Sequence, residues 1–508
     1  MTDRLRSPYT RREFLGEASC AAVGTISVLS TILNLKMANH LAAADLAPMA
    51  AGSPVTDYKS LVCIFQAGGN DSFNVLIPNS ATEYGEYAAS RSNLAIPQGS
   101  LLNLNLSPPL TGSGQEDRGD FGLHPAMTEL ADMFNGTGAF AGNRRLSLAA
   151  NVGTLVEPTT KTEYVNGSVQ LPKALFSHVD QIEQWQTAVP QGATQLSGWA
   201  GRAADVLHST VNIDETTMQV STVPMNISLN GRNAFQTGQS TEQFVITPSG
   251  GLLFSGQDAT SGMLLAKNQG LDNMISQQYA NLLTQTFADL TKDSVEKQEE
   301  FQDTFDNPGA AIDAALDSVA WPGGYFATTL RAAAKTIAIR DQLGLRRQTL
   351  FVQFGGWDHH GELLDTQNGM LLILSQGIHA FQLALEALGV QDEVVSFTAS
   401  DFGRTLRSNG RGTDHAWGGN PMVFGAPVEG GHVFGAYPSL VLDANSDVGR
   451  GGRMLPSTPV DGFFVEMLKW FGVSQQNMPY VLPNIENFYD LNSLFDGVSP
   501  TLPLGLIS

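Results

Sequence analysis

Three short apolar runs in this chain each end in a glycine or another small residue, followed by an aspartate. A nearly continuous series of Val, Ile and Phe over this length is typical of a strand buried on both faces. The aspartates would lie just past the carboxyl ends of these strands, where open α/β sheets bind their ligands. The three segments are 61–71 (LVCIFQAGGND), 350–358 (LFVQFGGWD) and 394–401 (VVSFTASD).

Helical periodicity precedes the second and third runs, at about 325–343 and 370–388. Two successive helix–strand units with this spacing predict a parallel sheet wound with crossover helices, and therefore an α/β fold. Residues 146–152 (LSLAANV) predict a further buried strand, and 459–472 predict a final amphipathic helix.

The domain organisation follows from changes in composition. We expect a single α/β domain over 58–495, with a β-rich insertion around 212–262 that could form a flap over the site. The insertion is rich in Thr, Ser, Gly and Asn and contains an Asn230-Gly231 turn. Residues 496–508 form a tail.

The amino terminus resembles a twin-arginine export signal. Arg11 and Arg12 are followed by Phe14-Leu15 and by a moderately apolar stretch from 18 to 35. Residues 1–57 are therefore expected to be signal plus linker, with the twin-arginine translocase as the partner during export. The expected location is periplasmic or extracellular, and no membrane span is predicted apart from the signal.

Composition excludes some classes of function. The 508 residues carry a net charge of −21, from 49 acidic and 28 basic residues, which argues against nucleic acid as a partner. The two cysteines, Cys20 and Cys63, lack metal-ligand or CxxC spacing, so no disulfide framework is predicted. A redox protein has little support, because there is no haem attachment motif and no GxGxxG fingerprint.

Histidines follow two of the strand-end aspartates. His360 lies close to Asp358, and His415 follows Asp401 in a glycine-rich loop. Each residue alone could equally be part of a turn, a helix cap or an inert surface. Together they favour a divalent metal site, because hard ions bind carboxylate oxygens and Zn or Mn also binds imidazole. The ion could be Zn, Mn, Ca or Mg.

At this point the sequence resembles a family, the domain of unknown function 1501 group. The resemblance extends in order over nearly the whole chain after the signal. The matching pieces are GGNDSFN at 68–74, LHPAM at 123–127, SHVDQIEQW at 177–185, GWAGR at 198–202, GGWDHHG at 355–361, SDFGRT at 400–405 and GTDHAWGG at 412–419.

This family looks like a branch of the alkaline phosphatase and sulfatase superfamily. The resemblance implies a mostly parallel central sheet with helices on both faces and a site of one or two metals. Carried over, the implied metal ligands are Asp71, Asp358, His360, Asp401, Asp414 and His415. The implied catalytic residues are Ser177, Arg404 and His178.

The resemblance also implies roles for the catalytic residues. Ser177 would be the nucleophile, because a helix amino terminus and a metal both stabilise an alkoxide. Arg404 and His178 would hold the anionic group of the substrate. Ser177 could instead be a plain helix N-cap, and Ser72 is a rival nucleophile.

Three departures from the superfamily pattern place one metal site in doubt. Asp358 and His360 are closer together in sequence than the corresponding Asp and His of the superfamily usually are. Phe402 follows Asp401 where a histidine is common, and Asn420 stands where relatives would have histidine. Two hypotheses follow. The first is an exported metal-dependent hydrolase of phosphate or sulfate esters, acting on a small molecule or a glycan. The second is a non-catalytic exported binding or assembly protein on the same fold.

Overall fold

The computed structural model describes residues 57–108, 120–192, 197–213, 219–252 and 260–507. The chain divides into two compact units, Met1–Ser53 and Pro54–Ser508, and every described residue belongs to the second. The predicted twin-arginine segment lies outside the described residues.

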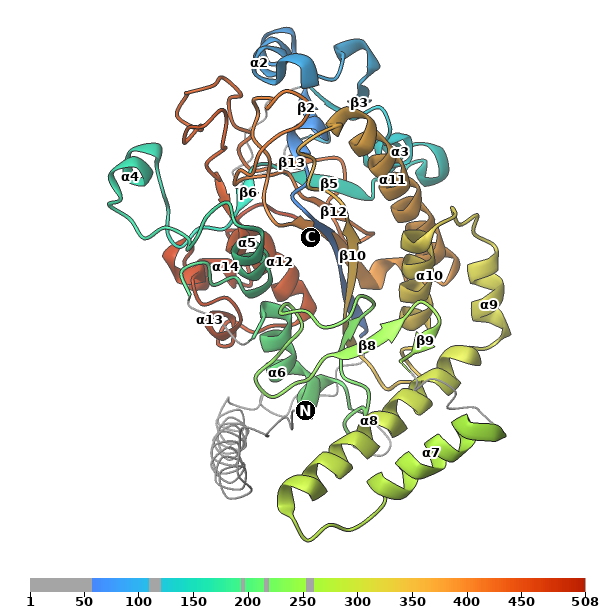
Figure 1. Cartoon of the computed structure of the whole chain (residues 1–508). Coiled ribbons are helices and arrows are strands. Elements are labelled where there is room, and N and C mark those ends of the chain that lie inside the picture. Colours follow the sequence, from blue (N-terminus) through green and yellow to red (C-terminus); the bar gives the residue numbers. More distant parts are fainter. Residues whose placement is uncertain (1–56, 109–119, 193–196, 214–218, 253–259, 508) are drawn as a thin grey trace, which may run out of the picture. The chain divides into compact units, whose positions relative to one another are not determined.

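Three long parallel strands form the centre of the main sheet (Figure 1). β1 (Lys59–Ala67) lies between β10 (Arg347–Gly355) and β11 (Val394–Ser400) and pairs in parallel with both. In the register, Ala67 is opposite Gly355, and Gln66 is opposite Ser400. The three strands therefore end at one edge of the sheet, as the sequence pattern predicted.

Shorter strands extend the sheet on both sides, in the order β13-β5-β12-β11-β1-β10-β7-β8-β9. β12 is antiparallel to both its neighbours, β11 and β5, and β9 is antiparallel to β8. The other strands all run in one direction, which confirms a mostly parallel α/β sheet. The added strands are β13 (Val433–Phe434), β5 (Leu146–Ala149), β12 (Met422–Phe424), β7 (Asn226–Ser228), β8 (Phe244–Thr247) and β9 (Gly250–Gly251).

The predicted insertion contributes to this sheet. β7, β8 and β9 all come from the segment 212–262, and they continue the sheet beyond β10 instead of forming a separate flap. Pairing with β10 gives the backbone N–H and C=O groups of β7 hydrogen-bond partners within the sheet. In an isolated hairpin, these groups would bond to water.

Helices cover both faces of the sheet (Figure 1). α10 (Tyr325–Ala338) and α11 (Leu363–Ala387) pack together on one face, near α3 (Thr128–Asn135). α6 (Trp199–Val211) and α12 (Val460–Phe471) lie on the other face, as does α5 (His178–Thr187). The helices predicted before β10 and β11 and after β13 are thus present.

The other elements lie around this core. The helices are α2 (Ala81–Arg91), α4 (Lys161–Asn166), α7 (Gly262–Ile275), α8 (Leu282–Asp306), α9 (Ala310–Asp317), α13 (Met478–Val481) and α14 (Leu491–Leu494). Two small sheets are formed by β2 (Leu76–Pro78), β3 (Leu102–Leu104) and β4 (Phe121–Leu123), and by β6 (Val152–Gly153) with β14 (Thr458–Pro459).

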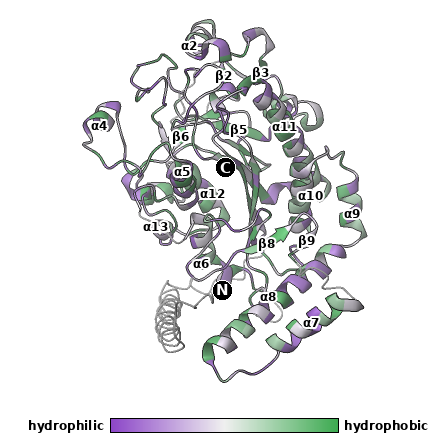
Figure 2. Cartoon of the chain, viewed as in Figure 1, coloured by the Kyte–Doolittle hydropathy of each residue, from purple (hydrophilic) through white to green (hydrophobic). Residues whose placement is uncertain are grey.

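Hydrophobic residues are concentrated along the central strands, whereas α8 has a mixed pattern (Figure 2). Between the sheet and the helices on one face, the ring of Trp199 lies 4.4 Å from that of Phe464 and 5.9 Å from that of Phe397, measured between centroids. Cys63 is a buried free thiol in β1, and burial raises its pKa. It is a core residue, as expected.

Among the described residues, α11 is the one helix with the length and apolar composition to cross a membrane. In the structure, 56% of its most apolar window is buried, and the helix packs against α10 and α3. Packing inside the domain accounts for its apolar character.

The segment predicted as a tail docks on the domain. The buried Glu466 carboxylate of α12 accepts hydrogen bonds from the backbone N–H groups of Leu504, Gly505 and Leu506. Ile507 forms an antiparallel bridge with Val428. The carboxyl-terminal segment is therefore fixed by three hydrogen bonds to one buried carboxyl group and by this bridge.

Candidate metal centre

Glycines bring the ends of β1 and β10 into close contact. Gly68 has φ of +122°, a region that side chains disfavour, and a Cβ there would lie 2.5 Å from the backbone nitrogen of Asp358. The N–H of Gly68 donates to Oδ1 of Asp401 at 2.9 Å. The glycine break in the first apolar run therefore positions the aspartates that follow the other two runs.

Asp401 holds the ring of His178. Its Oδ2 lies 2.7 Å from Nδ1 of His178, and the aspartate is only 1% exposed. An ionised carboxylate can only accept, so Nδ1 carries a proton and Nε2 is left available. Nε2 lies 3.5 Å from Oδ2 of Asp358.

His415 is held in the same tautomer by a backbone group. Its Nδ1 lies 2.9 Å from the carbonyl oxygen of Phe176. A carbonyl oxygen can only accept a hydrogen bond, so Nδ1 carries the proton. Burial lowers the pKa of His415, so the ring is neutral near pH 7 and its Nε2 is an unprotonated acceptor. This Nε2 lies 3.4 Å from Oδ1 of Asp358.

His360 completes the group. Its Nε2 lies 3.0 Å from Oδ1 of Asp358 and 3.0 Å from Nε2 of His415. Its Nδ1 lies 3.4 Å from Oδ1 of Asp414, so a carboxylate faces the far side of this ring as well. We refer to His178, Asp358, His360 and His415 as the His–Asp cluster.

The His–Asp cluster brings several hydrogen-bond acceptors close together, namely Nε2 of His178, Nε2 of His415 and the Asp358 carboxylate. The described residues His178, Asp358 and His415 offer ligand atoms that all lie within 4.8 Å of one another. Nε2 of His178, His360 and His415 lie 3.5, 3.0 and 3.4 Å from the Asp358 carboxylate, and Nε2 of His360 lies 3.0 Å from Nε2 of His415. Ligands of a tetrahedral ion with bonds of about 2.0–2.1 Å are about 3.3 Å apart. Imidazole with carboxylate suits Zn or Mn better than Ca or Mg.

Arg404 keeps Asp358 ionised. Burial raises the pKa of Asp358, but a hydrogen bond and the charge of Arg404 outweigh it, and the pKa is lowered. Nη1 of Arg404 donates to Oδ1 of Asp358 at 2.6 Å, and its other donors contact the side chain and carbonyl oxygen of Thr413. The guanidinium is fully buried. Arg404 therefore orients Asp358, which differs from the predicted role of holding a substrate anion.

Asp71 does not join the cluster. Its Oδ2 forms a 2.5 Å ion pair with Arg91 of α2, and both side chains are fully buried. Oδ2 also lies 3.4 Å from the hydroxyl of Thr413, whereas Oδ1 has no partner among the described residues. Asp71, which the resemblance implied as the first metal ligand, therefore neutralises the buried Arg91.

The remaining predicted ligands separate into two layers. Asp358, His360 and His415 present atoms to the cluster, whereas Asp401 and Asp414 face the Nδ1 atoms of two histidines. Carboxylates in this second position fix the tautomer and orientation of metal-ligating histidines. His178, predicted to hold a substrate anion, takes one of the inner positions.

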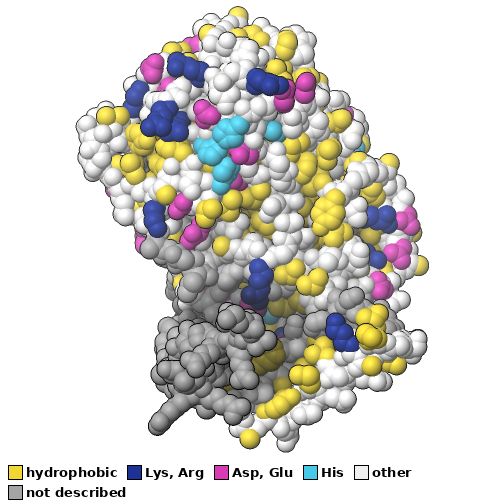
Figure 3. Space-filling model, in the orientation of Figure 1, with side chains coloured by type: hydrophobic (Ala, Val, Ile, Leu, Met, Phe, Trp, Pro, Cys, Tyr) yellow, Lys and Arg dark blue, Asp and Glu magenta, His cyan; other side chains and the backbone are white. Residues whose placement is uncertain are grey.

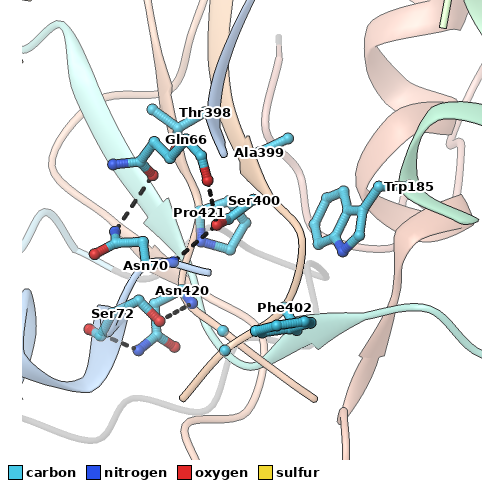
Figure 4. Close-up of a pocket in the computed structure, with 12 residues that line it drawn as sticks. Gln66, Asn70, Ser72, Trp185, Thr398, Ala399, Ser400, Phe402, Asn420 and Pro421 are labelled. Atoms are coloured by element: carbon cyan, nitrogen blue, oxygen red, sulfur yellow. Dashed lines mark hydrogen bonds between the residues drawn. The ribbon is translucent and has the colours of Figure 1, made fainter. Parts of the chain in front are cut away.

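Neither candidate serine hydroxyl is directed to the cluster by its hydrogen bonds. Ser177, at the N-cap of α5, donates to Oδ2 of Asp180 at 2.6 Å. Ser72 accepts from the backbone N–H of Asn420 at 2.8 Å, and the Asn420 amide donates to the carbonyl oxygen of Ser72 (Figure 4). Asn420 therefore has a structural place beside Ser72.

A small cavity lies next to this network (Figure 4). Gln66, Ser400 and Phe402 are among its lining residues, and Trp185 faces it from α5. Its volume of about 20 Å³ is room for one or two waters, not for a substrate. The histidines, in contrast, gather at the surface on one face of the molecule, with acidic side chains among them and basic side chains nearby (Figure 3).

Three arginines form a basic rim near the histidines. Nε of Arg453 donates to the carbonyl oxygen of His415 at 3.0 Å, and its guanidinium lies 3.7 Å from the centroid of the Phe176 ring. The positive charge of Arg450 acts on Arg453 and helps to lower its pKa. The aliphatic part of Arg407 lies against Gly451, the residue after Arg450. Arg407 and Arg450 are exposed and form no ion pair with a carboxylate of the described chain.

A family model described as "Protein of unknown function (DUF1501)" matches residues 58–450, which is more than half of the chain. The chain belongs to this family. The match covers β1, β10, β11 and every residue of the His–Asp cluster. A comparison with curated proteins found no match.

Proposed function

We propose that this protein of the DUF1501 family is a metal-dependent hydrolase of phosphate or sulfate esters. The observation that carries the proposal is the contact between Nε2 of His360 and Nε2 of His415 at 3.0 Å, beside the Asp358 carboxylate. Arg404 already donates to Oδ1 of Asp358. A single proton on His360 cannot also satisfy Nε2 of His178, Nε2 of His415 and Oδ2 of Asp358, whereas one divalent cation can contact all of these atoms.

The residues fit a metal ion, with His178, Asp358 and His415 as ligands and His360 beside them, a set of three that leaves a position for water or an ester oxygen. A divalent ion bound there supplies a Lewis acid for ester oxygens and lowers the pKa of water. The chain's own residues do the remaining work. Asp401 and the Phe176 carbonyl keep two histidines in the ligand tautomer, and the basic rim attracts and orients an anionic ester in an otherwise acidic protein.

We propose water, not serine, as the nucleophile. The Ser177 hydroxyl donates to Oδ2 of Asp180, and it has no hydrogen bond to a residue of the His–Asp cluster among the described residues. Water would attack phosphorus or sulfur in line with the leaving oxygen, which departs as the alcohol. The products are the free alcohol and inorganic phosphate or sulfate.

We also infer an alkaline-phosphatase-like arrangement and export by the twin-arginine route. The first inference is supported by the mostly parallel sheet and by the metal-type side chains after β10 and β11. The second is supported by Arg11, Arg12 and the apolar stretch after them. Moderate hydrophobicity in that stretch favours this route over a membrane anchor.

A screen of phosphate, sulfate and phosphonate esters tests the activity. We expect the exported protein to hydrolyse at least one class, with loss of activity on chelation and recovery on adding Zn²⁺ or Mn²⁺. His415→Ala should lose activity, whereas Asn273→Ala on α7, far from the site in sequence, should retain it. Hydrolysis that survives complete removal of divalent ions would contradict the proposal.

A second function, binding without catalysis, is favoured by one observation. Phe402 packs against His178 and His415, with ring centroids 4.8 and 4.6 Å apart, where a superfamily enzyme commonly has another ligand. In this case a metal would be present, but none of the esters would be hydrolysed.

A further inference from the structure

The basic rim consists of Arg407, Arg450 and Arg453, and no carboxylate of the described chain forms an ion pair with any of them. Most other described arginines do have such a partner, as Arg347 has Asp57. In a chain with a net charge of −21, three neighbouring cations without a counter-charge form a local positive potential. The rim is therefore suited to an anion that comes from outside the chain.

The backbone at the centre of the rim has a conformation that disfavours arginine. Arg450 has φ of +56°, between Gly449 at +104° and Gly451 at +89°. Glycine adopts the left-handed region readily, whereas a residue with a side chain is strained there. The fold would be served better by glycine at position 450, so the exposed guanidinium is the feature that needs an explanation.

Hydrogen bonds fix the rim against the His–Asp cluster. The backbone N–H of Arg407 donates to the carbonyl oxygen of Gly451 at 2.9 Å, and Nε of Arg453 donates to that of His415 at 3.0 Å. The buried carboxylate of Asp447 accepts from the N–H of Gly449 at 2.7 Å, which holds the loop from behind. The fold therefore sets the distance between the rim and the cluster.

Arg450 and Arg453 are close enough for their charges to repel. Burial and the charge of Arg450 lower the pKa of Arg453, although Tyr164 and Asp414 act in the opposite direction. An anion bound between the two guanidinium groups would remove this repulsion. Phosphate and sulfate fit best, because their oxygens match the planar fork of arginine donors.

The rim and the cluster are separated by a short distance. Arg404 donates to Asp358 of the cluster, and Arg407 of the rim follows three residues later. Three residues of chain span at most about 11 Å. One small substrate, or two neighbouring units of a longer one, can therefore reach both places at once.

We propose that the basic rim binds a second phosphate or sulfate group of the substrate whose ester lies at the His–Asp cluster. The substrate class is then a molecule that carries at least two such groups, joined by a short linker. The assignment rests on the proposed hydrolase function, because that function places the first group at the cluster.

A nucleic acid also carries repeated phosphates, but the rim does not favour it. The guanidinium of Arg453 lies 3.7 Å from the centroid of the Phe176 ring and so covers a face on which a base could stack. The net charge of −21 opposes a long polyanion, whereas a small substrate experiences chiefly the rim.

Alkane bisphosphonates and alkane disulfonates test the proposal, because ester hydrolysis does not cleave their C–P and C–S bonds. The probes are the butane, hexane and octane compounds, each compared with its monophosphonate or monosulfonate. Calorimetry measures their binding to the full exported protein. The variant is Arg407→Gln with Arg450→Gln. The control, Arg232→Gln with Arg331→Gln, removes the same charge from two exposed arginines elsewhere.

Arg450→Gly is a second variant that separates binding from folding. Glycine removes the left-handed strain, so the melting temperature should equal or exceed that of the wild type. Binding of the two-group probe should nevertheless weaken. An Arg450→Gly variant that binds this probe as the wild type does would show that the guanidinium has no part in binding.

We expect one two-group probe to bind at least about tenfold more tightly than its one-group partner. The rim variant should lose this factor, and the control should keep it. Whether the bisphosphonate or the disulfonate series shows the effect identifies the anion. The proposal is overturned if the second group adds no affinity or if the two double variants lose affinity equally. It is also overturned if a single-stranded DNA oligonucleotide binds more tightly, with the same dependence on the rim.

Titrations repeated after chelation distinguish the rim from the hydrolase. The dissociation constants of the rim variant and its control should still differ about tenfold, because the arginines do not depend on the metal. Equal constants in a protein that hydrolyses esters would overturn the rim alone. A tenfold difference in a protein without metal or hydrolysis would support the anion site and contradict the hydrolase.

Discussion

Nδ1 of His178 and Oδ2 of Asp401 lie 2.7 Å apart, although 223 residues separate them in sequence. α5 supplies the histidine and the end of β11 supplies the aspartate. Since Asp401 also accepts from the N–H of Gly68, it connects the β1 turn to the His–Asp cluster. We therefore treat Asp401 as a positioning residue for His178.

Asp401→Asn should weaken metal binding. An asparagine amide can donate to Nδ1, which would leave the proton on Nε2 and remove one ligand atom. Loss of such a partner costs roughly 10–100-fold in metal affinity. Competition with a fluorescent chelator measures this. Asp303→Asn on α8 is the control, and equal affinities in the two variants would contradict the role given to Asp401.

Arg453 should act through His415 and Phe176. Phe176 has a left-handed backbone, with φ of +73°, which its surroundings must maintain. The guanidinium stacks on its ring while donating to His415, so Arg453→Ala should reduce metal affinity by roughly tenfold. Arg453→Lys keeps the charge and loses the planar stack, and should recover only part of the affinity. Full recovery would show that charge alone matters.

Asp71→Asn separates two roles. As the partner of buried Arg91, its loss should lower the free energy of unfolding by roughly 3–5 kcal/mol. The folded variant should keep its metal, because Asp71 lies outside the cluster. Denaturant unfolding and elemental analysis of the same sample measure both. Metal loss at unchanged stability would restore Asp71 as a ligand.

Ser177→Ala should leave hydrolysis within about twofold of the wild type, because no covalent intermediate on serine is needed. The comparison uses kcat on the best ester found. A fall of about 10³-fold or more, with metal content intact, would identify Ser177 as the nucleophile after all.

Metal affinity should decrease as the pH is lowered. Burial lowers the pKa of His415 below the ordinary value of about 6.5, so protons begin to compete with metal only below that pH. The neutral ring's contribution to stability has the same sign: it is complete above about pH 6.5 and is lost as pH falls through the lowered pKa. Affinities measured between pH 8 and pH 5 test this. Constant affinity over that range would exclude histidine ligands.

The sequence predicted the strand ends better than the site. Apolar runs that end in a glycine or another small residue identified β1, β10 and β11, because buried parallel strands have a strong local pattern. Long-range pairing leaves no such pattern. Nothing near Asp71 indicated that Arg91 would neutralise it, and the motif around His178 gave no sign that its ring would face Asp358. Arg453 was missed for the same reason.

The most direct test of the account is X-ray absorption of the metal in protein recovered after export. We predict about one Zn or Mn per chain, with nitrogen and oxygen ligands at about 2.0–2.2 Å and the scattering pattern of two or three imidazoles. His415→Ala should remove one imidazole from that pattern. A protein without bound divalent metal, or a metal site without imidazole, would contradict the central claim.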